Sequence, residues 1–252
     1  MRKDNRMYIS DDGIKLHIEL EMPEKAPDKV PLVIVNHGFT GHMEEDHIVA
    51  AARACREKGY ATLRVEMYGH GQSGGDFKDH TLFKWISNLI AVIDYARSLD
   101  FVTDIYLCGH SQGGLNVMLV GGMKHEHIKG IIELAPAAMI PELARDGTLL
   151  GYDFDPENMP EELEVRPGRV LGDNYVRTAQ MIHIEDSIDR YAGPVLIVQG
   201  TNDYPELMAS AKYASERYRN CKYVEIEGST HCYDGYLSEM TEAIKNWLPD
   251  VY

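Results

Sequence analysis

Apolar residues recur along this chain in two different patterns of spacing. Short runs rich in valine and isoleucine predict buried strands, at residues 31–37, 60–66, 104–108, 128–134, 194–199 and 222–226. Longer stretches with apolar residues at three-to-four spacing predict helices, at residues 44–58, 82–99, 112–124, 205–218 and 236–247. Because strands and helices alternate, we expect an α/β fold with a mostly parallel central sheet and helices on both faces.

Two segments depart from this alternation. Residues 7–10 and 15–21 flank a turn at Asp11-Asp12-Gly13, which predicts a hairpin and an antiparallel sheet edge. Residues 137–183 carry proline, glycine and acidic residues and show no long strand or periodic helix, so we expect an inserted lid subdomain between core segments 1–136 and 184–252. Its larger apolar residues would suit the roof of an apolar pocket, and they are Leu149, Leu150, Tyr152, Phe154 and Tyr175. A surface excursion without a binding role stays open.

Composition narrows the class of protein. The 252 residues fit one hydrophobic core with an insertion. Forty acidic against 25 basic residues give a net charge of −15, which argues against nucleic acid or an anionic membrane surface as partner. The first residues are polar and lack the pattern of an export signal, although the possibility that such a signal was removed stays open. No apolar run in the sequence is long enough to span a membrane. Four cysteines without metal-ligand spacing favour a reduced, cytoplasmic setting.

The predicted strand at 104–108 runs into Gly109-His110-Ser111-Gln112-Gly113, and a predicted helix begins at once. A G-x-S-x-G pattern at a strand-to-helix turn predicts a nucleophilic serine, because the glycines permit a tight turn that exposes the hydroxyl. The helix N-terminus would favour developing negative charge. Ser111 is the predicted nucleophile.

A serine hydroxyl needs a base and a group that orients the base. Asp203 follows the strand at 194–199 in Gly200-Thr201-Asn202-Asp203, and His231 follows the last predicted strand. The chain order Ser111, Asp203, His231 is that of α/β-hydrolases. We therefore predict these residues as a catalytic triad. The oxyanion needs backbone donors, which we assign to the N–H groups of Gln112 and Phe39, the latter in the turn His37-Gly38-Phe39-Thr40-Gly41.

Two other polar segments have a structural explanation and predict no ligand site. His42, Glu44, Glu45, Asp46 and His47 cluster, but acidic residues are expected where a helix starts, so we expect no metal. The glycine-rich loop 69–75 lacks the Lys-Ser/Thr ending of a phosphate loop. We expect no cofactor.

These motifs together resemble the bacterial cinnamoyl and feruloyl esterase group of the α/β-hydrolases. The segments that carry the resemblance are 37–41, 64–71, 108–114, 134–141 and 230–234. The resemblance implies the α/β-hydrolase fold and hydrolysis of small aromatic esters of hydroxycinnamic acids, with the lid over the aromatic acid. It implies the same triad and oxyanion donors, and it makes Asp146, Tyr152 and Asp153 candidates for contact with phenolic hydroxyls of the substrate.

One departure from the group concerns the acid. Similar enzymes follow it with a segment ending in Val-Pro, whereas Tyr204-Pro205 follow Asp203 directly, so Glu227 or Asp234 stays open as an alternative. A general short-chain or acylglycerol esterase, or a hydrolase-fold binding protein without turnover, would share most of these features. An aspartate-nucleophile dehalogenase is disfavoured by Ser111. A neutral histidine base predicts activity that rises from mildly acid to neutral pH. A homodimer stays open.

Overall fold

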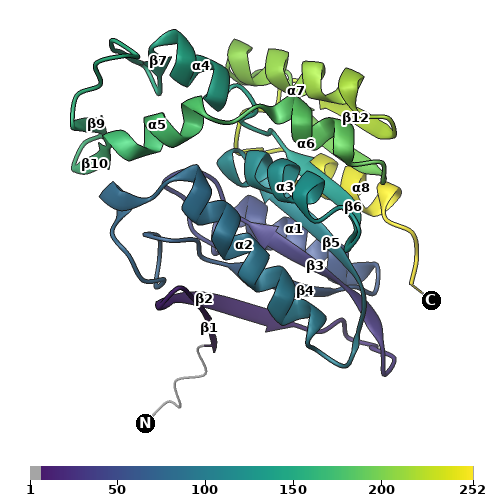
Figure 1. The fold of residues 1–252 in the computed structure, drawn as a ribbon. Helices are drawn as coiled ribbons and strands as arrows, with labels where there is room; N and C mark the ends of the chain where they lie inside the picture. Colours follow the sequence, from purple (N-terminus) through teal and green to yellow (C-terminus); the bar gives the residue numbers. More distant parts are fainter. Residues whose placement is uncertain (1–6, 252) are drawn as a thin grey trace.

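A computed structural model describes residues 7–251, and these form a central eight-stranded sheet (Figure 1). The strand order is β1-β2-β4-β3-β5-β6-β11-β12. The strands of this sheet are β1 (Met7–Asp11), β2 (Ile14–Glu21), β3 (Val30–Asn36), β4 (Ala61–Val65), β5 (Val102–His110), β6 (Ile128–Leu134), β11 (Val195–Gly200) and β12 (Cys221–Ile226).

The sheet confirms the predicted mixture of parallel and antiparallel strands. β4, β3, β5, β6, β11 and β12 pair in parallel, whereas β1 pairs antiparallel with β2, and β2 with β4. The parallel strands inside the sheet are buried along most of their length, because helices cover both faces, whereas the edge strand β12 is only partly buried. Their carboxyl ends meet at one edge of the sheet, where open α/β sheets carry their sites.

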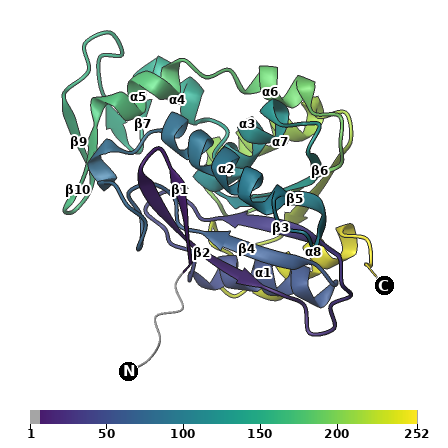
Figure 2. The same ribbon diagram turned by 60° about the horizontal axis from the view of Figure 1, so that its bottom comes forward.

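Helices cover the two faces unequally. On one face lie α1 (Asp46–Glu57) and α8 (Leu237–Trp247), and on the other lie α2 (Leu82–Arg97), α3 (Gln112–Met123), α6 (Ile184–Arg190) and α7 (Pro205–Arg217) (Figure 2). Each face carries its own buried apolar cluster. The seven-residue α6 was not predicted, since so short a helix shows little periodicity. Of the helices within residues 7–251, none is both long and apolar enough to cross a membrane.

The insertion contains more regular structure than its sequence predicts. It holds α4 (Ile140–Asp146), the short hairpins β7–β8 (Thr148–Leu149, Tyr152–Asp153) and β9–β10 (Glu162–Arg166, Arg169–Gly172), and α5 (Asp173–Gln180). These elements are too short for periodicity to reveal. Packing against the core stabilises them: β10 contacts the short 3-10 helix η1 (Phe77–Asp79), and α5 contacts α2.

Candidate active site

Ser111 occupies a strained turn between β5 and α3. Its φ of 55° and ψ of −119° lie in a region that non-glycine residues rarely adopt. Two backbone hydrogen bonds hold the turn: Ser111 N donates to the Leu134 carbonyl at 2.9 Å, and Ser111 O accepts from Ala137 N at 2.9 Å. The hydroxyl does not cap α3, although Ser111 is the N-cap residue. Strain at this position is typical of a functional serine.

The flanking glycines permit a close approach of backbone segments. A Cβ on Gly109 would lie 2.1 Å from the Gly113 carbonyl oxygen, and one on Gly113 would lie 2.4 Å from the His37 carbonyl oxygen. Any side chain at either position would therefore push the elbow apart. α3 itself is buried from Gln112 to Gly122, so it is a core helix on which the elbow has little freedom to move.

The loops after β11 and β12 bring Asp203 and His231 together. His231 Nδ1 lies 2.9 Å from Asp203 Oδ2, and the Asp203 side chain is fully buried. The same oxygen accepts from Gln199 Nε2 at 2.8 Å, while Oδ1 accepts from the Tyr204 amide at 2.7 Å. Burial opposes ionisation, but these donors outweigh it and hold the pKa of Asp203 below its ordinary value. The carboxylate is thus charged and fixed beside the imidazole.

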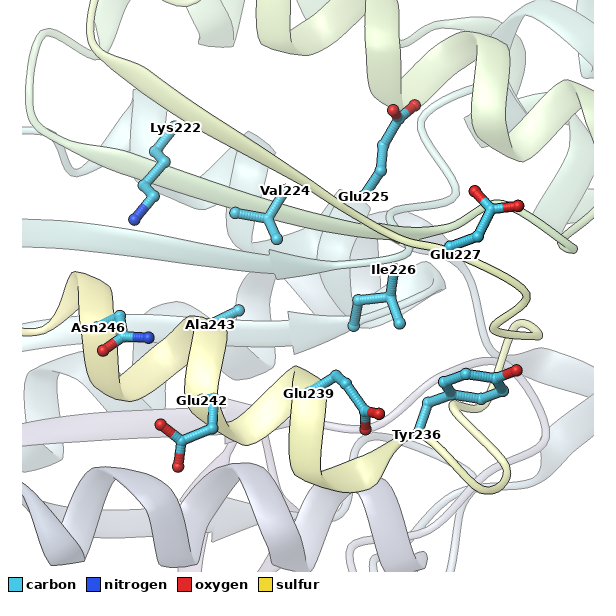
Figure 3. A pocket seen from close by; sticks show the side chains of 10 residues that line it. All are labelled: Lys222, Val224, Glu225, Ile226, Glu227, Tyr236, Glu239, Glu242, Ala243 and Asn246. Carbon is cyan, nitrogen blue, oxygen red and sulfur yellow. The ribbon is translucent and has the colours of Figure 1, made fainter.

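The short segment after Asp203 does not displace the acid. α7 begins at Pro205, with Tyr204 as its N-cap residue. The alternative acids lie elsewhere: Asp234 Oδ2 accepts from Thr230 Oγ1 at 3.3 Å, and Glu227 lines a groove of about 620 Å³ between β12 and α8 (Figure 3). None of Ser111, Asp203 and His231 lines that groove.

Ser111 and His231 are joined through the residue before the nucleophile. His110 Nε2 lies 2.9 Å from the His231 carbonyl oxygen, and the two rings are 4.7 Å apart between centroids. Tyr204 packs edge-on against the outer side of His231, with centroids 6.5 Å apart, and its side chain is exposed. The three residues predicted as a triad therefore come from loops that meet at one edge of the sheet.

The turn after β3 lies beside the nucleophile. Gly41 N donates to the Gly38 carbonyl at 3.1 Å, and a Cβ on Gly38 would lie 3.1 Å from Ser111 Cβ. His37 fixes the base of the turn, since its Nδ1 donates to the Gly38 carbonyl at 2.8 Å and its Nε2 accepts from Met67 N at 3.1 Å. Burial, and to a smaller extent the neighbouring His70, lowers the pKa of His37 to about 3. The ring is therefore neutral, and its Nε2 can accept the hydrogen bond from Met67 N. Phe39 follows Gly38 directly, as the predicted oxyanion donor requires.

The insertion contacts the site through Tyr175 on α5. The Tyr175 hydroxyl donates to Gln112 Oε1 at 2.7 Å, and both side chains are buried. The predicted phenol contacts behave differently. Asp146, Tyr152 and Asp153 are exposed, and the Tyr152 hydroxyl donates to the Glu164 carbonyl, which joins the two hairpins. The contacts found within residues 7–251 do not bring these three residues to the triad, and their role in binding stays a prediction.

Two polar features of the sequence serve packing. Residues 71–75 form a second G-x-S-x-G sequence, but the Ser73 hydroxyl donates to the Glu66 carbonyl and accepts from His17 N at 2.8 Å, in a loop rather than an elbow. From the cluster at 42–47, His47 bonds to His110. Nothing in the sequence pairs positions 47 and 110, because only the fold brings α1 against the elbow.

Comparisons with known proteins agree with this geometry. The family model described as serine aminopeptidase, S33, matches residues 27–152. Est1E from Butyrivibrio proteoclasticus, solved with ferulic acid bound, is 57% identical, covers 96% of this chain and 97% of its own, and has a TM-score of 0.94.

More distant relatives agree in fold. The mitochondrial palmitoyl-protein thioesterase ABHD10 of Mus musculus is 25% identical over 159 residues, which are 61% of this chain and 50% of that protein. This chain thus spans about half the length of the curated relatives it matches. A structure of the mouse ABHD10 protein has a TM-score of 0.76 at 17% identity, covers 96% of this chain and 97% of its own, and supports the fold alone. The chain belongs to the α/β-hydrolases, in the serine aminopeptidase S33 family, and to the feruloyl esterase group within them.

Proposed function

We propose that this protein is a serine carboxylester hydrolase that cleaves esters of hydroxycinnamic acids. The observation that carries the proposal is the 57% identity, over 96% of the chain, to a protein solved with ferulic acid bound. The site adds chemical support: an ionised, buried carboxylate holds an imidazole whose backbone is bonded to the residue before a strained serine. The substrate is therefore a small aromatic ester.

In the proposed acylation step, the Ser111 hydroxyl oxygen attacks the ester carbonyl carbon while His231 Nε2 takes the hydroxyl proton. The tetrahedral oxyanion accepts hydrogen bonds from the backbone N–H groups of Gln112 and Phe39. The C–O bond to the alcohol then breaks, and His231 returns the proton to the alcohol oxygen. The product is a free alcohol and an acyl-enzyme on Ser111.

Deacylation repeats these steps with water. His231 takes a proton from water, the oxygen attacks the acyl carbon, and the bond to Ser111 breaks as the serine regains its proton. The hydroxycinnamic acid leaves. Asp203 stays deprotonated during both acylation and deacylation, because its lowered pKa favours the carboxylate. Its negative charge stabilises the imidazolium that forms on His231.

The insertion is proposed as the lid over the acyl group. Its α5 is attached to the elbow by the Tyr175–Gln112 hydrogen bond, so the insertion and the proposed oxyanion donor are mechanically connected. This attachment explains how a segment of short elements can hold a fixed position over the site.

The decisive experiment compares turnover of methyl ferulate, chlorogenate and p-nitrophenyl butyrate by the native protein and by Ser111→Ala. We expect the aromatic esters to turn over, and we expect the variant to lose on the order of 10⁶-fold in kcat. Ser73→Ala is a matched control, because that serine also lies in a G-x-S-x-G sequence but its hydroxyl is hydrogen-bonded to the backbone of Glu66 and His17. Cleavage of the butyrate alone would support a general short-chain esterase, and ligand affinity without turnover would support a binding protein.

A second candidate activity is thioester hydrolysis of long acyl chains. The match to a palmitoyl-protein thioesterase favours it, but at 25% identity and half of that protein's length. The same nucleophile would serve both reactions. Hydrolysis of palmitoyl-coenzyme A faster than methyl ferulate, at equal subsaturating concentration, would favour the thioesterase.

A further inference from the structure

We propose that His47 and His110 are positioning residues that fix the backbone of His231 through a chain of two hydrogen bonds. His110 Nε2 lies 2.9 Å from the His231 carbonyl oxygen, and His110 Nδ1 lies 3.0 Å from His47 Nε2. The inference deepens the proposed function and rests on it for the role of His231.

The acceptor at one end sets the direction of the whole chain. A carbonyl oxygen can only accept, so His110 Nε2 must carry the ring proton. A neutral His110 then has a lone pair on Nδ1, which must accept from a proton on His47 Nε2. Both rings are therefore neutral Nε2–H tautomers.

Burial keeps both rings in these neutral forms. His47 is 4% exposed and His110 is 3% exposed. Desolvation lowers the pKa of His47 to about 4 and, together with the adjacent His47, lowers the pKa of His110 well below its ordinary value. A second proton on His110 would replace the acceptor at Nδ1 by a donor, and the chain would break at that atom.

The chain joins three parts of the site that lie far apart in sequence. His47 lies on α1, which follows the turn at residues 37–41, and its ring meets that of His110 edge-on at 4.1 Å between centroids. His110 precedes Ser111 and also contacts the turn, since a Cβ on Gly38 would lie 3.1 Å from its Nδ1. His231 is only partly buried, so its ring has freedom that a fixed backbone would restrict.

Without the His47 donor, His110 loses the reason to keep its proton on Nε2. The other tautomer would place a lone pair on Nε2, facing the His231 carbonyl oxygen, and two acceptors repel each other. The loop carrying His231 would shift, and a misplacement of about 1 Å in a catalytic group can cost on the order of 100-fold in rate. The effect should fall on kcat, because both rings are buried and act on His231 only through its backbone carbonyl.

The test compares His47→Leu with His47→Gln, whose amide can place a donor near the position of Nε2. We expect His47→Leu to lower kcat by about 10-fold to 100-fold with KM within about twofold, and His47→Gln to recover most of the loss. Cys55→Ala, a buried change on the same helix away from the chain, should leave kcat unchanged. Assays use p-nitrophenyl butyrate beside methyl ferulate, so a failure of the hydroxycinnamate assignment does not remove the readout.

Nitrogen NMR of the imidazole rings gives an answer that does not depend on turnover. We expect Nε2–H tautomers for His47 and His110 in the native protein, and a changed His110 signal in His47→Leu. The proposal is overturned if His110 carries its proton on Nδ1, if His47→Leu keeps the native kcat, or if His47→Gln recovers no more activity than His47→Leu.

Discussion

Replacing Asp203 by asparagine should remove most of the activity and leave the fold intact. The carboxylate receives His231 Nδ1 and Gln199 Nε2 on one oxygen and the Tyr204 amide on the other. An asparagine offers one acceptor oxygen and an amide donor, so one of these positions must face donor against donor in either orientation. The variant also loses the charge that stabilises the imidazolium.

The magnitude follows from the geometry. With Asp203 Oδ2 at 2.9 Å from Nδ1 and a fully buried carboxylate, the charge centres are roughly 4 Å apart, and their attraction at an effective dielectric of about 20 is about 4 kcal/mol. At about 1.4 kcal/mol per tenfold, this predicts a loss on the order of 10³-fold in kcat. The accompanying tautomer error brings the loss toward about 10⁴-fold.

The assay is steady-state hydrolysis of methyl ferulate, with circular dichroism to show that Asp203→Asn is folded. Asp234→Asn is the matched control, since Asp234 lies three residues after His231 and accepts only from Thr230 among the side-chain contacts found in residues 7–251. We expect the control to keep kcat within about twofold. A loss below about tenfold in Asp203→Asn, or an equal loss in the control, would refute the assignment of the acid.

Three further changes test the packing around the site. Burial raises the pKa of Glu133 to about 8, so the folded state binds a proton that the unfolded state releases above its ordinary pKa. The free energy of unfolding should therefore fall by a few kcal/mol as the pH rises toward 8, and Glu133→Gln should flatten this fall in urea titrations. An unchanged slope would contradict this. Tyr175→Phe should cost about 1–3 kcal/mol of unfolding free energy in the same titrations, because it leaves the buried Gln112 amide unpaired. Gly113→Ala should prevent accumulation of folded protein, since its Cβ would meet the His37 carbonyl at 2.4 Å; native expression and melting temperature would refute the packing argument.

Much of the fold was predictable because burial imposes a readable pattern. All six parallel strands and the antiparallel hairpin were predicted to within two residues at every end, since a strand covered on both faces must be apolar along its length. The short helices and hairpins of the insertion were not, because elements of this length are stabilised by contacts with η1 and α2 rather than by their own periodicity.

The candidate site divides in the same way. Ser111, Asp203 and His231 could be named from the sequence because each lies in the turn or loop that follows a recognisable strand, and parallel strands end at one edge of the sheet. The sequence left Glu227 and Asp234 open as alternatives to Asp203, because all three lie in loops near His231 and only the fold shows that Asp203 contacts its imidazole.

The sequence by itself determined the sheet, the elbow at Ser111 and the chain order of the predicted triad Ser111, Asp203 and His231, because local pattern and chain connectivity control these features. Only the tertiary structure decided that Asp203 meets His231, that Tyr175 attaches the insertion to Gln112, and that His47 bonds to His110. The residues of each pair lie 28 to 63 positions apart in the chain. A hydrogen bond across that separation depends on the placement of whole elements to within a fraction of an ångström, and no local pattern of residues encodes such a distance.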